Sequence, residues 1–198
     1  MDQLIISIGR EYGSGGHEIA EKLASKLDLP LYDRNMIEEI ALDKNVDHSE
    51  LEKYDESPKK RLFSRTVRGL SASNEQNVAN MQFDYLKQKA SQGKSFVVVG
   101  RCAETVLKGN NALISIFILG DMENKVNRIM KLRNMSMDEA KSAINRHDRT
   151  RKAYHNSYSE MKWGDSRNYD ITVNSSKIDL DEIVEMLLLY IDKRMNKK

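Results

Sequence analysis

Four glycines in eight residues, from Gly9 to Gly16, form the part of this sequence best suited to chemistry. Glycine tolerates positive φ and leaves room for an anion to approach the backbone. At the start of a helix, such a turn directs backbone N–H groups at an anion, which the helix dipole also attracts. The sequence therefore predicts a phosphate-binding turn formed by Gly13, Ser14, Gly15, Gly16 and His17.

Two positions of this turn differ from the nucleotide-binding P-loop, in which a lysine and then a serine or threonine follow the final glycine. Gly16 and His17 stand in those places, so the turn has neither a lysine for the β- and γ-phosphates nor a hydroxyl for Mg²⁺. Arg10, at the entrance of the turn, is our candidate for the missing positive charge. The alternative is a tight strand-to-helix turn that binds nothing, with His17 as an ordinary residue of the first helical turn.

Arginines form the second set of candidates, because a planar guanidinium grips phosphate oxygens with paired hydrogen bonds. Arg101 follows an apolar strand and a glycine, at the strand's carboxyl end, where open α/β sheets bind their ligands. Five more arginines lie on the two helices predicted after residue 121, namely Arg128, Arg133, Arg146, Arg149 and Arg151. The last three cannot all share one helical face, and the alternative for Arg128 and Arg133 is a solvated surface.

The remaining polar and basic candidates have structural alternatives. Asp33 either caps the helix predicted after it or contacts a ligand, and its spacing leaves both interpretations open. The basic run from Lys59 to Arg68 is typical of solvated surface, with contact to an acceptor as the alternative. Cys102 and the ten methionines are typical of packing.

The elements that must position these residues alternate along the chain between strand and helix. Apolar runs predict buried strands at residues 4–8, 95–100, 113–118 and 169–173. Apolar residues recur at helical spacing after the glycine turn, from Ile19 to Leu27, and form a clean stripe from Leu180 to Ile191. Apolar strands separated by helices predict an α/β fold in which helices cover both faces of a parallel sheet.

Helix start signals refine this pattern. Ser136 and Glu139 form a capping box, and Asp121 can cap the helix that follows it. The segment from about 42 to 77 is polar and weakly periodic, which indicates a helical insertion, and a helix is predicted from about Glu75 to Gln92.

The composition excludes several classes of protein. With 198 residues, of which 39% are hydrophobic and 31% charged, the chain fits one globular domain. Its 32 basic and 30 acidic side chains nearly balance, which argues against a nucleic-acid binder but allows a local cluster that binds a small anion. A single cysteine excludes an internal disulfide and suits the reducing cytosol. With no signal peptide and no apolar run of membrane-spanning length, we expect a cytoplasmic protein; its oligomeric state stays open.

Five blocks of sequence, in this order, resemble the cytidylate kinase-like family, a branch of the P-loop nucleoside monophosphate kinases. The blocks are Ile8–Gly16, Tyr32–Arg34, Val98–Arg101, Asp148 with Arg151, and Asn168–Asp170 with Val173–Ser175. The resemblance runs nearly end to end and implies a single domain with the three-layer P-loop kinase fold. It implies a core of about 1–41 and 93–198, a helical acceptor-binding insertion of about 42–92, and an arginine-rich lid of about 133–165.

The same resemblance implies an activity and roles for residues. The activity is transfer of the γ-phosphoryl group of ATP, accompanied by Mg²⁺, to a nucleoside monophosphate, with a CMP-like acceptor favoured. The glycine turn falls on the loop that binds the donor phosphates, and Asp33, Arg34 and Arg101 fall on the acceptor side. Arg10 and the lid arginines Arg149 and Arg151 are the candidate catalytic residues, and no residue is assigned as a metal ligand.

Two alternatives stay open. Arg34 stands where cytidylate kinases usually carry a small hydroxyl residue, which leaves room for a kinase that acts on another small-molecule acceptor. Gly16 replaces the loop lysine of those enzymes, which leaves room for a nucleotide-binding sensor without catalytic activity.

Overall fold

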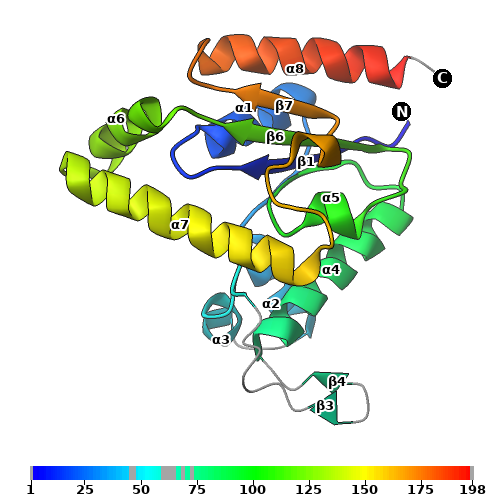
Figure 1. Ribbon diagram of the computed structural model, residues 1–198. Helices are drawn as coiled ribbons and strands as arrows, with labels where there is room; N and C mark the ends of the chain where they lie inside the picture. The colour runs from blue at the N-terminus through cyan, green and yellow to red at the C-terminus, as the bar shows by residue number, and fades with distance from the viewer. Residues whose placement is uncertain (1, 45–47, 59–65, 68–69, 72–73, 197–198) are drawn as a thin grey trace.

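A five-stranded parallel sheet lies at the centre of the computed structural model, which describes residues 2–44, 48–58, 66–67, 70–71 and 74–196. The strand order is β2-β5-β1-β6-β7 (Figure 1). The strands are β1 (Ile5–Arg10), β2 (Leu31–Tyr32), β5 (Phe96–Val99), β6 (Leu113–Leu119) and β7 (Ile171–Asn174). Every neighbouring pair in this sheet is parallel, so the carboxyl ends of all five strands share one edge.

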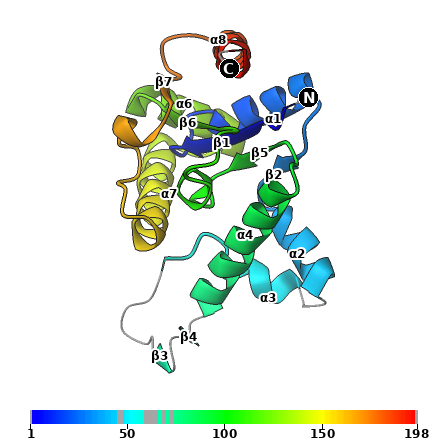
Figure 2. The same cartoon turned by 90° about the vertical axis from the view of Figure 1, so that its right-hand side faces the viewer.

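Helices cover both faces of the sheet, which gives the three layers of the predicted α/β fold (Figure 2). On one face lie α1 (Gly16–Leu27) and α8 (Leu180–Met195). On the other lie α2 (Met36–Lys44), α4 (Asn74–Ser91) and α5 (Ala103–Val106). Beyond the carboxyl edge of the sheet lie α6 (Met122–Arg133) and α7 (Met137–Tyr158).

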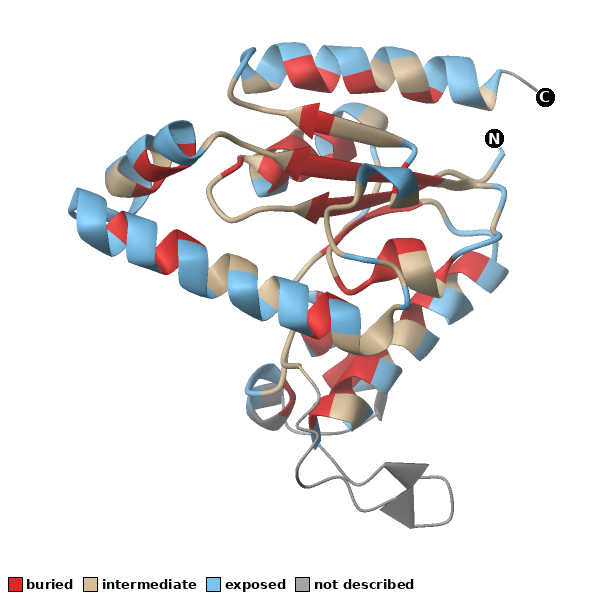
Figure 3. Cartoon of the chain, viewed as in Figure 1, coloured by how far each residue is buried: buried red, intermediate tan, exposed pale blue. Residues whose placement is uncertain are grey.

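The sheet is buried on both sides, which is why its strands are continuous apolar runs in the sequence (Figure 3). Successive side chains of a strand point to opposite faces. Ile6 and Ile8 therefore pack with α1 and α8, whereas Ile5 packs with the helices of the other face. The two apolar clusters fix the sheet, and with it the loops at its carboxyl edge.

Most predicted elements are confirmed, and two details differ. The capping box of Ser136 and Glu139 starts α7 as expected. Asp121 is the residue before α6, but its side chain accepts no hydrogen bond from the helix; its carboxylate binds Asn174 and Lys177 instead. The edge strand β2 was not predicted, because two residues are too short to show any periodicity.

The segment predicted as an insertion, 42–92, contains the end of α2, α3 (His48–Glu52), a two-stranded pair of β3 (Thr66–Val67) and β4 (Leu70–Ser71), and all of α4. The two short strands differ from the helical insertion that was predicted there. The side chains of the basic run from Lys59 to Arg68 lie outside the described residues. No helix in the described part of the chain is long and apolar enough to cross a membrane.

Candidate active site

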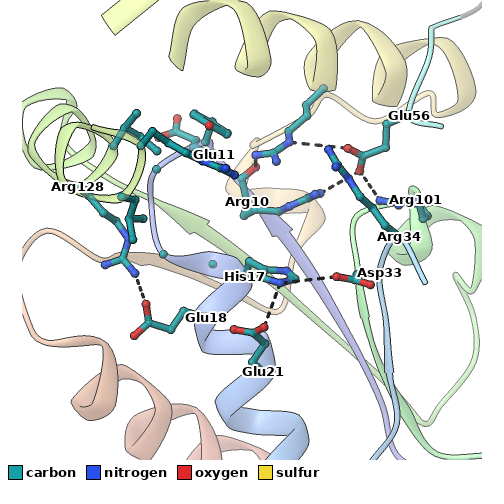
Figure 4. A pocket seen from close by; sticks show the side chains of 18 residues that line it. Arg10, Glu11, His17, Glu18, Glu21, Asp33, Arg34, Glu56, Arg101 and Arg128 are labelled. Carbon is teal, nitrogen blue, oxygen red and sulfur yellow. Dashed lines mark hydrogen bonds and ion pairs between the residues drawn. The ribbon is translucent and has the colours of Figure 1, made fainter. Parts of the chain in front are cut away.

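A cavity with a volume of about 620 Å³ opens at the carboxyl edge of the sheet (Figure 4). Loops after β1, β2 and β5 contribute to its wall, together with α1, α6 and α7. Eleven of the residues proposed from the sequence line it: Arg10, Gly13, Gly15, Gly16, His17, Asp33, Arg34, Arg101, Arg128, Arg133 and Arg151. Ser14 and Arg149 do not belong to this lining.

The glycine turn leaves β1 and enters α1 in a conformation that requires glycine at two positions. Gly13 has φ 84° and Gly15, the residue before the helix, has φ 79°. A Cβ atom on Gly15 would lie 2.8 Å from Leu180 Cδ1, so a side chain there would strain the backbone and also displace Leu180. No acceptor in the described part of the chain reaches the amides of Gly13, Gly15, Gly16 or His17. These N–H groups at the start of α1 are available to an anion in the cavity.

Ser14 faces away from the main cavity. Its hydroxyl donates to the carbonyl oxygen of Glu11 at 2.9 Å, and its side chain is buried. It lines a separate cavity of about 150 Å³ on the other side of the turn, together with Lys125 and Arg128. Only the backbone of Ser14 is therefore placed to shape the phosphate-binding turn.

A buried ion-pair network supports the turn from behind. Lys125 Nζ lies 2.8 Å from Glu11 Oε2 and 3.2 Å from Asp148 Oδ2, and the other oxygen of Asp148 accepts the Tyr12 amide at 2.6 Å. The Tyr12 ring stacks on His147, with ring centroids 4.2 Å apart. Because Lys125 lies on α6 and Asp148 on α7, the network fixes both helices to the glycine turn.

The side chain of Arg10 runs through a channel that two glycines leave open. A Cβ on Gly16 would lie 2.6 Å from Arg10 Cβ, and a Cβ on Gly100 would meet the Arg10 guanidinium and lie 2.5 Å from Glu56 Oε1. Arg10 therefore occupies the volume that a side chain at position 16 would need. This packing explains why a P-loop lysine cannot stand at position 16 while Arg10 is present.

Arg101 is held in an unusual backbone conformation at the carboxyl end of β5. Gly100, Arg101 and Cys102 have φ of 75°, 57° and 51°, and such a conformation costs a non-glycine residue about 1–3 kcal/mol. The guanidinium is almost fully buried, donating from Nη1 to Glu56 at 2.9 Å and from Nη2 to Asp55 at 2.8 Å. Arg101 Nε has no hydrogen-bond partner among the described residues. Strain at one buried cation beside a cavity indicates a functional rather than a packing role.

Glu56 is a site residue that sequence reasoning missed. Its Oε1 accepts from Arg10 Nη1 at 3.1 Å and from Arg101 Nη1 at 2.9 Å, and its Oε2 lies 3.9 Å from Arg151 Nε (Figure 4). Burial alone would raise the pKa of this carboxyl, but the guanidiniums of Arg10, Arg101 and Arg151 hold it well below its ordinary value. Glu56 is therefore an anion at the centre of three cations.

The lid arginines separate by helical face, as their spacing predicted. Arg151 is partly buried, lines the cavity and donates to the Arg10 carbonyl at 3.4 Å. Burial and the nearby Arg10 lower the pKa of Arg151 to about 10. Arg146 and Arg149 are exposed and lie outside the cavity lining. The structure thus brings Arg10, Arg101 and Arg151 together and leaves Arg149 outside the cluster.

The acceptor-side candidates form the opposite rim of the cavity. Asp33 Oδ1 accepts the Asn35 amide at 3.1 Å in the turn before α2, while Oδ2 lies 3.6 Å from His17 Nε2. Asp33 therefore shapes the turn before α2 and lines the cavity, and its contact with a ligand stays a prediction. His17 is exposed and also pairs with Glu21 at 3.3 Å, and Arg34 is exposed at the rim. Arg128 on α6 pairs with Glu18.

The fold matches solved structures of kinases. The chain is 16% identical to shikimate kinase from Aquifex aeolicus (TM-score 0.51), covering 97% of this chain and 98% of that one. It is 12% identical to a sugar kinase from Janibacter sp. (TM-score 0.55), covering 96% and 95%. An uncharacterized protein from Eubacterium ventriosum is 39% identical, with a TM-score of 0.77 and coverage of 96% and 99%. No functionally curated protein matches the sequence.

The five-stranded parallel sheet and these structural neighbours show that the chain has the fold of P-loop kinases. The model of the cytidylate kinase-like family matches residues 5–177. The chain belongs to this family.

Proposed function

We propose that this protein transfers the γ-phosphoryl group of ATP to a nucleoside monophosphate, with a CMP-like acceptor favoured. One observation carries the proposal: the free amides of the glycine turn and the guanidiniums of Arg10, Arg101 and Arg151 line the same cavity. Phosphoryl transfer needs alignment and positive charge around the migrating group more than it needs covalent chemistry. A volume of about 620 Å³ is within the range of small-molecule sites.

Donor binding is assigned to the start of α1. The amides of Gly13, Gly15, Gly16 and His17 would donate hydrogen bonds to the phosphate oxygens of ATP, since the helix dipole and four free N–H groups favour an anion there. Arg10 would supply the positive charge that a P-loop lysine supplies elsewhere, because it enters the cavity through the space beside Gly16.

Magnesium would enter with the ATP phosphates. No three His, Cys, Asp or Glu side chains in the described ranges group in a way that could hold a metal ion on their own. The Ser14 hydroxyl is directed at Glu11, so we assign no side chain of the turn as a ligand of the ion. When bound, the ion would offset negative charge on the transferred group.

Acceptor binding is assigned to Asp33, Arg34 and Arg101, with segment 42–92 as the acceptor-binding insertion and α7 as most of the lid. Arg101 would hold the acceptor phosphate, because its buried and strained guanidinium faces the cavity from the carboxyl end of β5. Arg151 would close over the transferred group from α7. The exposed Arg149 is placed for a catalytic role only if the lid moves on ligand binding.

A second candidate function is phosphorylation of another small anionic acceptor. The exposed guanidinium of Arg34 at the rim favours it, and shikimate and sugar kinases are among the proteins that share the fold. A sensor that binds ATP without turnover is the remaining alternative, and the missing loop lysine is its support.

A coupled ADP-release assay with Mg·ATP and a panel of nucleoside monophosphates, shikimate and simple sugars tests the proposal. We expect turnover with CMP or a related monophosphate. Arg151→Ala should lower kcat on the order of a thousandfold, as for a transition-state arginine, while the exposed Arg146→Ala on the same helix should leave it unchanged. Turnover with a non-nucleotide alone would favour the second candidate, and ATP binding without turnover would favour the sensor.

A further inference from the structure

Glu56 places a carboxylate where the arginines of the cavity converge. Its two oxygens contact Arg10, Arg101 and Arg151, which come from β1, the β5–α5 turn and α7. It lines the main cavity, and 19% of its side chain is exposed. A carboxylate that bridges several guanidiniums at a cavity wall makes the same charge-assisted hydrogen bonds that an oxyanion of a ligand would make.

The position of Glu56 is strained, whereas that of its neighbour Asp55 is supported. Glu56 has φ 47°, a conformation that costs a residue with a side chain on the order of 1–3 kcal/mol. Asp55 does not line the main cavity, and its carboxylate is held both by Arg101 Nη2 at 2.8 Å and by Gln82 Nε2 at 2.9 Å. If Glu56 withdraws, Asp55 still orients Arg101 through Nη2, and no carboxylate then stands between Arg101 Nη1 and a ligand in the cavity.

We propose that Glu56 is a specificity-determining residue that fills the three-arginine site as an internal anion, which an acceptor must displace with a phosphoryl group of its own. The inference rests on the proposed function, whose acceptor site it describes. An acceptor without a strong anionic group cannot replace the hydrogen bonds that Glu56 makes, so it is rejected. Every substrate must compensate for the hydrogen bonds lost when Glu56 leaves the arginines. A phosphoryl group compensates best, because it offers the guanidiniums more oxygens and more negative charge than other groups do.

The same contact restrains the enzyme when no acceptor is bound. While Glu56 neutralises Arg10 and Arg151, these cations stabilise charge on the γ-phosphate of ATP less. Attack of water on that phosphorus, which breaks the bond to the β-phosphate oxygen and yields ADP, inorganic phosphate and a proton, is therefore suppressed. Displacement of Glu56 by the acceptor frees the cations at the moment transfer becomes possible.

Titration of the full-length protein with inorganic phosphate by calorimetry tests this inference without requiring turnover. Glu56→Gln keeps the shape of the side chain and removes its charge. We expect Glu56→Gln to bind phosphate about tenfold more tightly, as it would if the wild-type site is open in about a tenth of molecules. It should also raise acceptor-independent ATP hydrolysis severalfold. The exposed Glu52→Gln, from the same segment, should match the wild type in both measurements.

If Glu56 instead orients the arginines permanently, Glu56→Gln should bind phosphate more weakly than the wild type. Equal or weaker phosphate binding by a folded Glu56→Gln protein would overturn the inference. If that variant does not fold, Glu56→Asp keeps the charge but shortens the reach, and it must bind phosphate more tightly than the wild type; unchanged affinity there also overturns it. Failure of the acceptor panel alongside tighter phosphate binding would reject the kinase proposal and retain the internal anion.

Discussion

Replacing Arg10 by glycine and Gly16 by lysine should move the proposed catalytic cation from position 10 to position 16 without removing it from the cavity. In Arg10→Gly the cavity loses the cation proposed to replace the P-loop lysine. In the double variant Arg10→Gly/Gly16→Lys, a lysine stands at the P-loop position and can extend into the space that Arg10 leaves. Gly16 is not among the glycines with positive φ, so its backbone accepts a lysine.

The expected magnitudes follow from the packing. In Gly16→Lys alone, the new Cβ would lie 2.6 Å from Arg10 Cβ and 3.3 Å from Ile118 Cβ, an overlap that costs about 1–3 kcal/mol of stability. Arg10→Gly alone should lower kcat/KM for ATP on the order of a hundred- to a thousandfold, as for other cations on a transferred phosphoryl group. The double variant should recover at least about tenfold of that loss, equivalent to about 1.4 kcal/mol of transition-state stabilisation.

Arg10→Ala/Gly16→Lys is the matched control. Alanine keeps the Cβ atom that collides with a side chain at position 16, so this variant should show no recovery. Steady-state kinetics with Mg·ATP, together with calorimetric ATP affinity, measures all variants. Wild-type kinetics in Arg10→Gly would refute the role of Arg10, and equal behaviour of the two double variants would refute the packing argument.

Three further predictions concern the turn and its supports. Gly15→Ala should weaken ATP binding at least about tenfold, because alanine at φ 79° and 2.8 Å from Leu180 Cδ1 would shift the phosphate-binding turn. Gly93→Ala, with φ 71° and nothing within 4 Å of the new Cβ, should keep wild-type affinity, and equal affinities of the two variants would contradict the role of the turn. Lys125→Met should lower the free energy of unfolding in denaturant by about 2–3 kcal/mol, because the Glu11 and Asp148 carboxylates lose their cation. An unchanged unfolding midpoint would show that these ion pairs do not stabilise the protein. The pKa of Glu56 is lower in the folded state than in the unfolded state, so the folded state binds fewer protons at this carboxyl. The stabilisation that this carboxylate contributes is therefore complete above the ordinary glutamate pKa of 4.5 and is lost as the pH falls towards the folded-state pKa. Glu56→Gln should make the stability less dependent on pH in this acidic range.

The sequence predicts those parts of the fold that depend on local pattern. Apolar runs mark β1, β5 and β6 because both faces of each strand are buried, and the glycines mark the turn because Gly13 and Gly15 adopt positive φ. The two-residue strand β2 leaves no such pattern, and its pairing with β5 depends on the sheet already formed.

Partners brought together by the tertiary fold could not be predicted in this way. Glu56 meets Arg10 and Arg101 from 46 and 45 positions away, in a segment whose pattern is polar and weakly periodic. Helical periodicity predicted that the arginines of α7 could not all face one way, but only the docking of the helix through Asp148 shows that Arg151 faces the cavity.

A crystal structure with a non-hydrolysable ATP analogue, Mg²⁺ and CMP tests the central claim most directly. The account predicts β- and γ-phosphate oxygens within hydrogen-bond distance of the amides from Gly13 to His17, and the CMP phosphate on Arg101 in the place of Glu56. Triphosphate bound elsewhere, with those amides facing only solvent or protein, would contradict it.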